Sequence, residues 1–175
     1  MLGVEVRDSE ISGSGVFATR NFKVGETVLV IDDSRVVSES APLNPNLGEF
    51  EHHQDYLAGG KRVLLPSPER YVNHSCDPNV FHMTFDQVRR MIARRDIPRG
   101  EEITTDYILN TYEGDLWLCT CGAERCRKQI VVSFFDLPID LQLEYLPELD
   151  SWFIKEHPEE VENLRSHRST LRSKR

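Results

Sequence analysis

The N-terminal two thirds of the chain carry short apolar runs separated by turn residues, a pattern that predicts short β-strands. Two of these runs lie within residues 16–31, on either side of a turn with Gly25 at its tip. A Gly-Gly pair at 59–60 separates two further candidate strands and predicts a hairpin. Apolar and polar positions alternate in places over residues 80–102, which end in a second turn. The pattern predicts a mainly β fold.

From residue 131 onward the apolar positions change to helical spacing. Pro138, Pro147 and Pro158 each open a stretch with acidic residues early, which is typical of helix starts. We therefore expect two or three short helices, the first two docked through Leu146 and the aromatic pair that follows it. Packing explains these aromatics better than a cofactor role does. The apolar stripes are Ile139, Leu143 and Leu146; Leu149, Trp152 and Phe153; and Val161 and Leu164.

The composition is that of an ordinary globular domain with an appendage, with 39% hydrophobic and 29% charged residues among 175. No stretch reaches the apolar length of a membrane span, and the N-terminus lacks a signal-peptide pattern. We therefore expect a soluble, intracellular protein, nuclear or cytoplasmic. The net charge of −8 disfavours direct nucleic-acid binding. It also suits a basic peptide partner, but plain solubility is the favoured explanation of the charge. The basic run at 165–175 is expected to be a solvated tail, with a nuclear-import or nucleic-acid patch as the alternative.

The four cysteines have a spacing that points to a metal. Cys119, Cys121 and Cys126 form a C-x-C-x4-C motif, and Cys76 is the remaining cysteine. One intervening residue is awkward for a disulfide but lets two thiolates converge on a tetrahedral ion. A Zn²⁺ held by all four thiolates has no open coordination position, so we expect a structural role. Two disulfides and four unrelated buried thiols are the alternatives, and we favour zinc over both.

Four motifs follow one another along the chain: GSGVFA at 13–18, RYVNHSCDPN at 70–79, PRGEEITTDY at 98–107 and CTCGAERCR at 119–127. Together they resemble the SET-domain lysine methyltransferases with a post-SET zinc loop, over residues 1 to about 130. The resemblance implies a SET-domain (β-clip-like) fold of small curved sheets with a threaded C-terminal segment. It also implies three parts: a SET domain (1–115), a post-SET zinc loop (116–130) and a helical C-terminal extension with a basic tail (131–175).

The resemblance implies that S-adenosylmethionine binds at the glycine-containing turn, where positions without side chains let main-chain groups approach closely. Asn73 and His74 match the pair that holds this cofactor, with groups that donate and accept hydrogen bonds. Taken singly, a plain turn and a structural histidine are the alternatives. Trp117 and Leu118 could cover the adenine or simply pack. The expected cofactor-binding residues are Gly13, Ser14, Gly15, Val16, Tyr71, Asn73, His74, Tyr107, Trp117 and Leu118.

Tyr107 matches the catalytic tyrosine of the family. A phenol fixed beside the path of the methyl group can orient the sulfonium and the amine and stabilise the changing charge. Tyr71 is expected to line the lysine channel and is the second catalytic candidate, with a core tyrosine as the alternative. The implied activity is methyl transfer from S-adenosylmethionine to the ε-amine of lysine, in a histone tail or another basic protein.

Two positions depart from the pattern of the family. Thr105 stands where many relatives carry an aromatic residue, and the added room predicts a di- or trimethylated product. A tyrosine expected after the first strands is missing, and Tyr56 is the candidate to replace it. These departures leave two alternatives open: a catalytically silent SET-like module that binds a peptide or partner, and a zinc-stabilised scaffold that acts through its helices. The oligomeric state is also left open.

Overall fold

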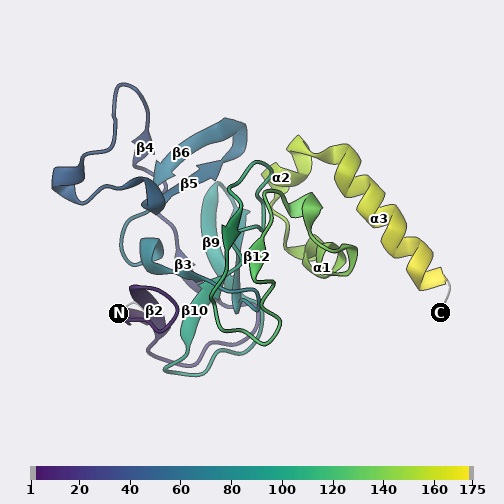
Figure 1. Ribbon diagram of the computed structural model, residues 1–175, viewed down its shortest axis with the longest axis horizontal. Helices are drawn as coiled ribbons and strands as arrows, with labels where there is room; N and C mark the ends of the chain where they lie inside the picture. Colours follow the sequence, from purple (N-terminus) through teal and green to yellow (C-terminus); the bar gives the residue numbers. More distant parts are fainter. Residues whose placement is uncertain (1–2, 174–175) are drawn as a thin grey trace.

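The computed structural model describes residues 3–173, with side chains up to Ser169, and Figure 1 shows their arrangement. Four small sheets make up most of the body, and three α-helices lie together on one side of it. The prediction of a mainly β fold with C-terminal helices is confirmed. No helix in the described part of the chain has the length and apolar character needed to cross a bilayer.

The larger core is built from two sheets. The first has the order β1-β2-β10-β7 and the second β3-β9-β8, and only β7 and β10 pair in parallel among these strands. Val16, Val80 and Ile103 are fully buried between them. The strands are β1 (Val4–Asp8), β2 (Ser14–Ala18), β3 (Thr27–Val30), β7 (Asn73–His74), β8 (Val80–Phe85), β9 (Val88–Ala93) and β10 (Glu102–Thr105).

Two smaller sheets flank this core. The segment before the Asn-His motif supplies β4 (Val36–Val37), β5 (Gln54–Leu57) and β6 (Lys61–Leu64), paired in the order β4-β6-β5. Gly59 and Gly60 lie between β5 and β6 with φ of +68° and +69°, which confirms the predicted hairpin and explains its glycines. β11 (Trp117–Leu118) and β12 (Gln129–Ile130) pair on either side of the cysteine motif.

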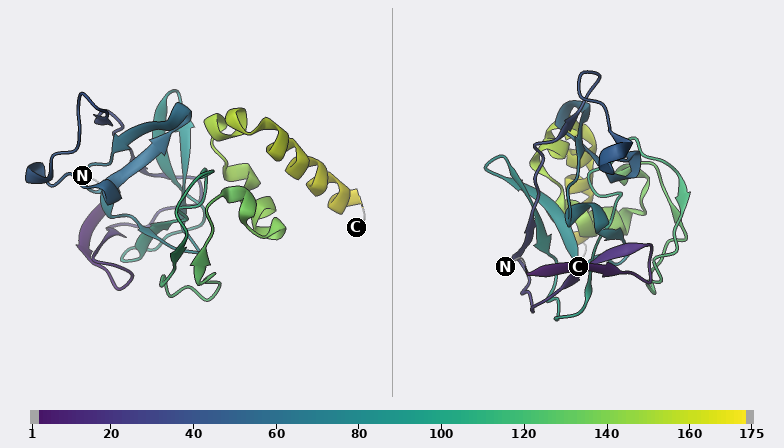
Figure 2. Two further views of the ribbon diagram at one scale, coloured as in Figure 1. Left: turned by 45° about the horizontal axis from the view of Figure 1, so that its top comes forward. Right: turned by 90° about the vertical axis from the view of Figure 1, so that its left-hand side faces the viewer.

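The C-terminal helices are α1 (Ile139–Tyr145), α2 (Ser151–Glu156) and α3 (Pro158–Ser173). Figure 2 shows α1 and α2 lying between α3 and the sheets. Leu146 and Phe153 are buried and Trp152 is partly buried, in a second core that also includes Cys76 and Cys119, so the predicted docking is confirmed. Single turns of 3₁₀ helix lie at Pro45–Leu47, Glu51–His53, Ala58–Gly60, Glu69–Tyr71, Phe134–Asp136 and Leu146–Glu148.

Two predicted details of this region are wrong. Ile139 is 45% exposed, because the buried side of α1 is formed by Gln142 and Tyr145. α2 begins after Asp150, whose carboxylate accepts a hydrogen bond from the Trp152 N–H, and not near Pro147. The basic run is helical as part of α3 up to residue 173, and its described side chains at 165–169 are mostly exposed, as expected for a solvated segment; residues 174–175 lie outside the described residues.

Two local features had no counterpart in the prediction. β1 is a strand of which only Val4 is buried. The tight turn between β8 and β9 is made by Asp86 and Gln87, with φ of +48° and +63°, although neither residue is a glycine.

Candidate functional site

The loop after β7 lies against β10, and this contact brings the Asn-His-Ser-Cys motif to Tyr107. The Ser75 N–H donates to the Thr105 carbonyl at 2.9 Å, and the Asn79 N–H donates to the Thr104 carbonyl at 3.1 Å. The Asn79 side chain adds a third hydrogen bond between the loop and β10, because its Oδ1 accepts the Thr104 N–H at 2.9 Å. Two motifs about thirty positions apart in the sequence therefore form one rigid unit.

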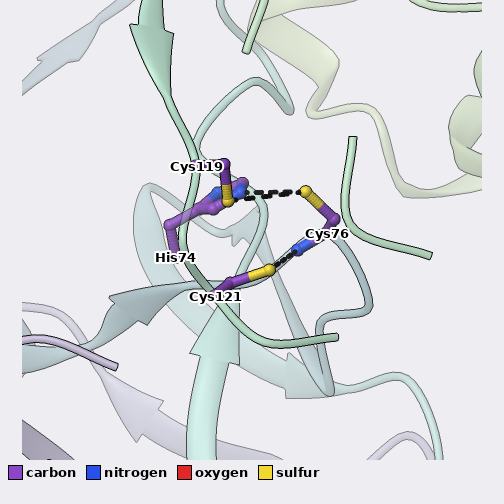
Figure 3. Close-up of side chains that lie close together, drawn as sticks. All are labelled: His74, Cys76, Cys119 and Cys121. Carbon is purple, nitrogen blue, oxygen red and sulfur yellow. Dashed lines mark hydrogen bonds between the residues drawn. The ribbon is translucent and has the colours of Figure 1, made fainter. Parts of the chain in front are cut away.

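Four potential metal ligands converge beside this unit. The ligand atoms of His74, Cys76, Cys119 and Cys121 all lie within 4.8 Å of one another, and Figure 3 shows them facing a common centre. Cys126 lies next to this group, with its thiol 3.7 Å from the Cys119 carbonyl oxygen. Three of the four predicted metal ligands, Cys76, Cys119 and Cys121, thus lie in one group together with His74.

The hydrogen bonds of His74 define its tautomer. The Tyr107 N–H donates to Nδ1 at 3.2 Å, so the ring proton is on Nε2. Nε2 lies 3.4 Å from Cys76 Sγ and can donate to it. Burial lowers the pKa of His74 to about 4, and Arg127 adds to that effect against the opposing charge of Asp106. A neutral His74 can thus donate to Cys76 Sγ and support the cluster without being a metal ligand itself.

The thiols of the cluster differ in acidity. Burial raises the pKa of Cys76 to about 11 and also raises that of Cys119. Burial acts against ionisation of Cys121 too, but the main-chain N–H groups of Cys76 and Ala123 outweigh it and lower its pKa to about 7. Cys121 therefore ionises more readily than Cys76 and Cys119, and a bound divalent cation would ionise these neighbours as well.

A small cavity of about 210 Å³ lies beside the cysteines. Of the predicted cofactor residues, Asn73, His74, Tyr107 and Trp117 line it. The ring of His74 packs edge-on against that of Trp117, with centroids 4.9 Å apart. Its remaining lining residues are Ile11, Ser12, Cys119, Thr120 and Cys121. A cavity of this size fits one part of a nucleoside-sized ligand, because whole-ligand pockets usually start near 300 Å³.

The glycine-containing turn lies at one side of this cavity without lining it. Gly13 is exposed with φ of +47°. At Gly15 a Cβ would lie 2.3 Å from Glu102 Oε1, so the close approach that this glycine permits is made here by a protein carboxylate. Ser14 is partly buried beside them, and Val16 is buried in the core.

Asn73 holds this turn in place. Its Nδ2 lies 2.8 Å from Glu102 Oε1 and 3.1 Å from the Ser14 carbonyl oxygen. The Glu102 carboxylate also accepts the Ser9 hydroxyl at 2.8 Å. The donors of Asn73 are therefore engaged within the protein, and the residue orders the turn as well as lining the cavity.

A larger cavity of about 720 Å³ lies between the β5–β6 hairpin and α2. Tyr107 lines both cavities, so it marks the boundary between them. Thr105 and Tyr56 also line the larger one, and Tyr56 is 61% exposed. Tyr71 lines neither cavity and packs partly buried against the His53 ring, and Leu118 is 78% exposed outside both.

The Tyr107 hydroxyl is fixed by the main chain. It donates to the Val72 carbonyl oxygen at 2.8 Å. The residue is half exposed, but burial of its hydroxyl end raises the pKa of Tyr107 to about 12, with a further contribution from the charges of Asp55 and Glu102. Tyr107 is therefore a neutral phenol at physiological pH.

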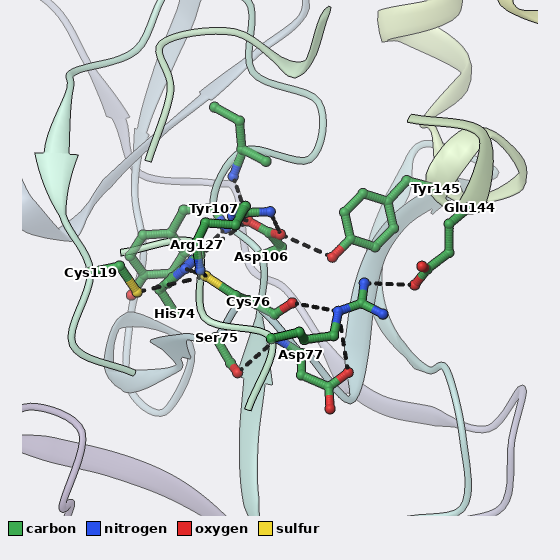
Figure 4. Close-up of polar contacts among 12 residues, drawn as sticks. His74, Ser75, Cys76, Asp77, Asp106, Tyr107, Cys119, Arg127, Glu144 and Tyr145 are labelled. Atoms are coloured by element: carbon green, nitrogen blue, oxygen red, sulfur yellow. Dashed lines mark hydrogen bonds and ion pairs between the residues drawn. The ribbon is translucent and has the colours of Figure 1, made fainter. Parts of the chain in front are cut away.

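Asp106, directly before Tyr107, was missed by the sequence analysis. Its fully buried carboxylate accepts two hydrogen bonds from the Arg127 guanidinium, at 2.7 and 2.8 Å, and one from the Tyr145 hydroxyl at 2.9 Å (Figure 4). Arg127 follows the last cysteine of the motif, and Tyr145 ends α1. One carboxylate therefore joins the Tyr107 turn, the cysteine loop and the C-terminal extension.

A second set of ion pairs supports the same junction. Glu144 accepts from Arg125 at 2.9 Å and from Arg94 at 3.1 Å. The Arg125 Nε–H in turn donates to the Cys76 carbonyl at 3.2 Å. α1 is thus linked to the cysteine cluster through intermediates: Glu144 through Arg125, and Tyr145 through Asp106 and Arg127.

Comparison with known proteins agrees with this arrangement. A profile of the SET domain family matches residues 13–108, more than half of the chain. Human histone-lysine N-methyltransferase 2B is 33% identical over 138 residues, which cover 71% of this chain and 5% of that protein. Drosophila melanogaster histone-lysine N-methyltransferase trithorax is 28% identical over 137 residues, covering 73% and 4%.

A shorter match is with the H3 lysine-9 specific histone-lysine N-methyltransferase KMT1 of Fusarium mangiferae, 38% identical over 82 residues, covering 37% of this chain and 24% of that protein. The chain thus belongs to the SET domain family. It spans less than a quarter of the length of these curated relatives.

The Asp106 junction predicts a specific cost for removing one hydroxyl. Tyr145→Phe leaves a buried carboxylate with one donor fewer, so we expect the free energy of unfolding to fall by about 2 kcal/mol. Urea denaturation measures the change. Tyr112→Phe, at a half-exposed tyrosine, is the control and should change stability by less than about 0.5 kcal/mol. Equal effects of the two variants would show that the Tyr145 hydroxyl does not support Asp106.

Proposed function

We propose that this chain transfers a methyl group from S-adenosylmethionine to the ε-amine of lysine in a protein substrate. The observation that carries the proposal is the position of Tyr107, a neutral phenol that lines both the small cavity beside the cysteines and the large cavity between the β5–β6 hairpin and α2. Family membership and the names of the relatives support it, since each relative is a histone-lysine N-methyltransferase. Histone tails or other basic proteins are the proposed substrates.

The small cavity is the proposed cofactor side. The rings of His74, Tyr107 and Trp117 offer faces on which an apolar or aromatic part can pack. When bound, the cofactor supplies a methyl group on a positively charged sulfonium. The exposed Gly13 turn, held by Asn73 and Glu102, is proposed to contact the rest of the ligand with its main-chain groups.

Tyr107 is the proposed catalytic residue. Its hydroxyl is held by the Val72 carbonyl and its main-chain N–H by His74, so both ends of the residue are fixed. A fixed phenol can orient a substrate amine and stabilise the charge that changes during transfer. Tyr71, the second predicted candidate, packs beside the Val72 main chain and is proposed to act only by supporting this arrangement.

The lysine must lose a proton before it can accept a methyl group. With a pKa near 10.4, the neutral amine costs about 3 kcal/mol at pH 8. Partial burial beside a positive sulfonium lowers that pKa, because both effects disfavour the ammonium. Thr105 and the Tyr107 ring would line this part of the path.

Zn²⁺ is the proposed structural ion, held by Cys76, Cys119, Cys121 and Cys126. The donor set fits, because three thiols converge within 4.8 Å and the fourth lies beside them. His74 is less suited as the fourth ligand, since its Nδ1 accepts the Tyr107 N–H and its Nε2 carries the proton. We propose the same three-part division as the motifs imply: SET domain 1–115, zinc loop 116–130 and helical extension 131–175.

The catalytic proposal predicts that Tyr107→Phe abolishes most methyl transfer. Losing one oriented hydroxyl should lower kcat by about 100-fold or more while cofactor binding persists. Labelled cofactor and a panel of basic proteins measure transfer, and calorimetry measures binding.

Tyr112→Phe is the matched control, because Tyr112 lines the large cavity but not the small one. If the wild-type chain binds cofactor and peptide but transfers no methyl group to any protein, the alternative of a silent binding module is correct.

The zinc proposal predicts one zinc per chain in metal analysis of the purified protein. Cys126→Ser should contain substoichiometric zinc and release it faster to a chelator. His74→Gln should retain zinc, because the imidazole is assigned as a donor to a thiolate. Loss of zinc from His74→Gln with retention in Cys126→Ser would make His74 the fourth ligand instead.

The room at Thr105 predicts more than one methyl group on the product. Its side chain lines the large cavity beside Tyr107, and its hydroxyl has no partner there. Mass spectrometry of a saturated reaction should show di- or trimethyl-lysine for the wild type and a shift toward monomethyl-lysine for Thr105→Phe. Thr105→Val, of equal size, should keep the wild-type distribution if it remains folded by thermal denaturation. Only monomethyl product from the wild type would contradict this prediction.

A further inference from the structure

A carboxylate behind the wall of the small cavity is held by neutral groups. Glu102 is partly buried in β10, and its side chain accepts the Ser9 hydroxyl at 2.8 Å and the Asn73 Nδ2 amide at 2.8 Å. Among the residues whose side chains the structure describes, no arginine, lysine or histidine forms an ion pair with it. Taking a charged group out of water is costly unless an opposite charge balances it.

The neighbouring acids along the chain have such a partner. The Glu101 carboxylate accepts from the Arg95 guanidinium at 3.0 Å. Asp106, four residues after Glu102, pairs with Arg127 at 2.7 Å. Glu102 therefore lacks the kind of counter-charge that these two acids possess, and a cationic ligand would supply it.

The hydrogen bonds of Glu102 lead directly to the wall of the small cavity. Asn73 lines that cavity, and its Nδ2 lies 3.2 Å from the Ser12 carbonyl oxygen as well as contacting Glu102. The Ser9 hydroxyl, which donates to Glu102, accepts the Ile11 N–H at 3.0 Å. Ile11 and Ser12 are lining residues too, so one carboxylate is connected to three wall residues from two separate segments.

The glycine-containing turn leaves room for this carboxylate. A Cβ at Gly15 would lie 2.8 Å from the Glu102 Cδ, which is closer than real Cβ contacts come. Any side chain at position 15 would therefore push the Glu102 carboxylate away from Ser9 and Asn73. The turn and the carboxylate thus form one local structure beside the small cavity.

The charge of Glu102 also acts where the two cavities meet. Burial, followed by the charges of Asp55 and Glu102, raises the pKa of Tyr107 to about 12. Tyr107 lines both cavities, and under the proposed function the donor and the lysine amine meet beside it. A positive sulfonium at this place would lie within the field of a carboxylate that has no other cation.

We propose that Glu102 is a positioning residue for the methyl donor: its carboxylate fixes the wall of the small cavity through Asn73 and Ser9, and the sulfonium of the donor balances its negative charge. The inference rests on the proposed function, because it takes S-adenosylmethionine as the ligand of the small cavity. It also gives the site a means to distinguish the donor from the spent product. S-adenosylhomocysteine keeps the adenosine and amino-acid parts but lacks the positive charge on sulfur, so it leaves Glu102 unbalanced.

Calorimetry with S-adenosylmethionine and S-adenosylhomocysteine tests the inference without any methyl transfer. The wild type should bind the donor about fivefold more tightly than the product. Glu102→Gln keeps the shape and an acceptor oxygen but removes the charge, so the two ligands should bind about equally. Glu102→Asp keeps the charge on a shorter side chain, so both ligands should bind more weakly while the preference persists. Glu101→Gln is the matched control and should leave the preference unchanged, because Arg95 already balances that charge.

A measurement on the wild type alone decides the matter if thermal denaturation shows that Glu102→Gln does not fold. The preference for the donor should decline as the salt concentration rises from about 0.05 M to about 0.5 M, because salt screens the attraction. A preference that persists in the folded variant, or in high salt where the variant is unfolded, overturns the inference.

The same measurements separate this inference from the proposed activity. Equal binding of both ligands by the wild type overturns the role of Glu102 and leaves the proposed function standing. A preference that Glu102→Gln removes, in a chain that transfers no methyl group to any protein, supports the role of Glu102 and overturns the proposed activity. A wild type that binds neither ligand overturns both.

Discussion

The buried carboxylate of Asp106 is the interaction on which the arrangement of the site depends. A charged group without exposed surface is stable only if donors surround it, and here Arg127, Tyr145 and the Ile108 N–H supply them. These donors come from the cysteine loop, the C-terminal extension and the turn after Tyr107. Breaking such a buried pair typically costs about 3–5 kcal/mol. The position of Tyr107 is therefore coupled to segments that come later in the chain.

This coupling gives the C-terminal extension a role in the site. Arg94 packs over the Tyr145 ring at 4.7 Å and pairs with Glu144 and Glu148, so α1 is anchored on the sheets as well as on the cysteine loop. Its apolar residues share one core with Cys76 and Cys119. The extension thus belongs to the same folded unit as the cysteine cluster.

Local patterns predicted the parts of the fold that depend on neighbouring residues. The hairpin at Gly59 and Gly60 was predictable because left-handed φ values favour glycine, whereas the turn at Asp86 and Gln87 was not, because it lacks that signal. The convergence of Cys76 with Cys119 and Cys121 could be inferred from ligand spacing and number. The buried face of α1 could not be predicted from the apolar spacing. Gln142 is buried there, with hydrogen bonds to the Phe135 and Leu137 carbonyls, whereas Ile139 is exposed.

The site was predictable where a motif carries the chemistry and not where tertiary contacts do. Tyr107 and the Asn73–His74 pair were named from their motifs, and they do line the cavities. The pairing of Asp106 with Tyr145, 39 positions later, has no sequence signal. The role of Gly15, whose missing Cβ makes room for Glu102, has no sequence signal either.

Much of the wall of the large cavity comes from three stretches that are remote in sequence: β5, the residues just after Tyr107, and α2. None of them contributes a cysteine to the cluster. Under the proposed function, substitutions in these stretches could therefore alter which polypeptides are accepted while the residues of the small cavity stay unchanged. If the proposed function is correct, the residues that select the substrate could change in evolution independently of most of those that bind the cofactor.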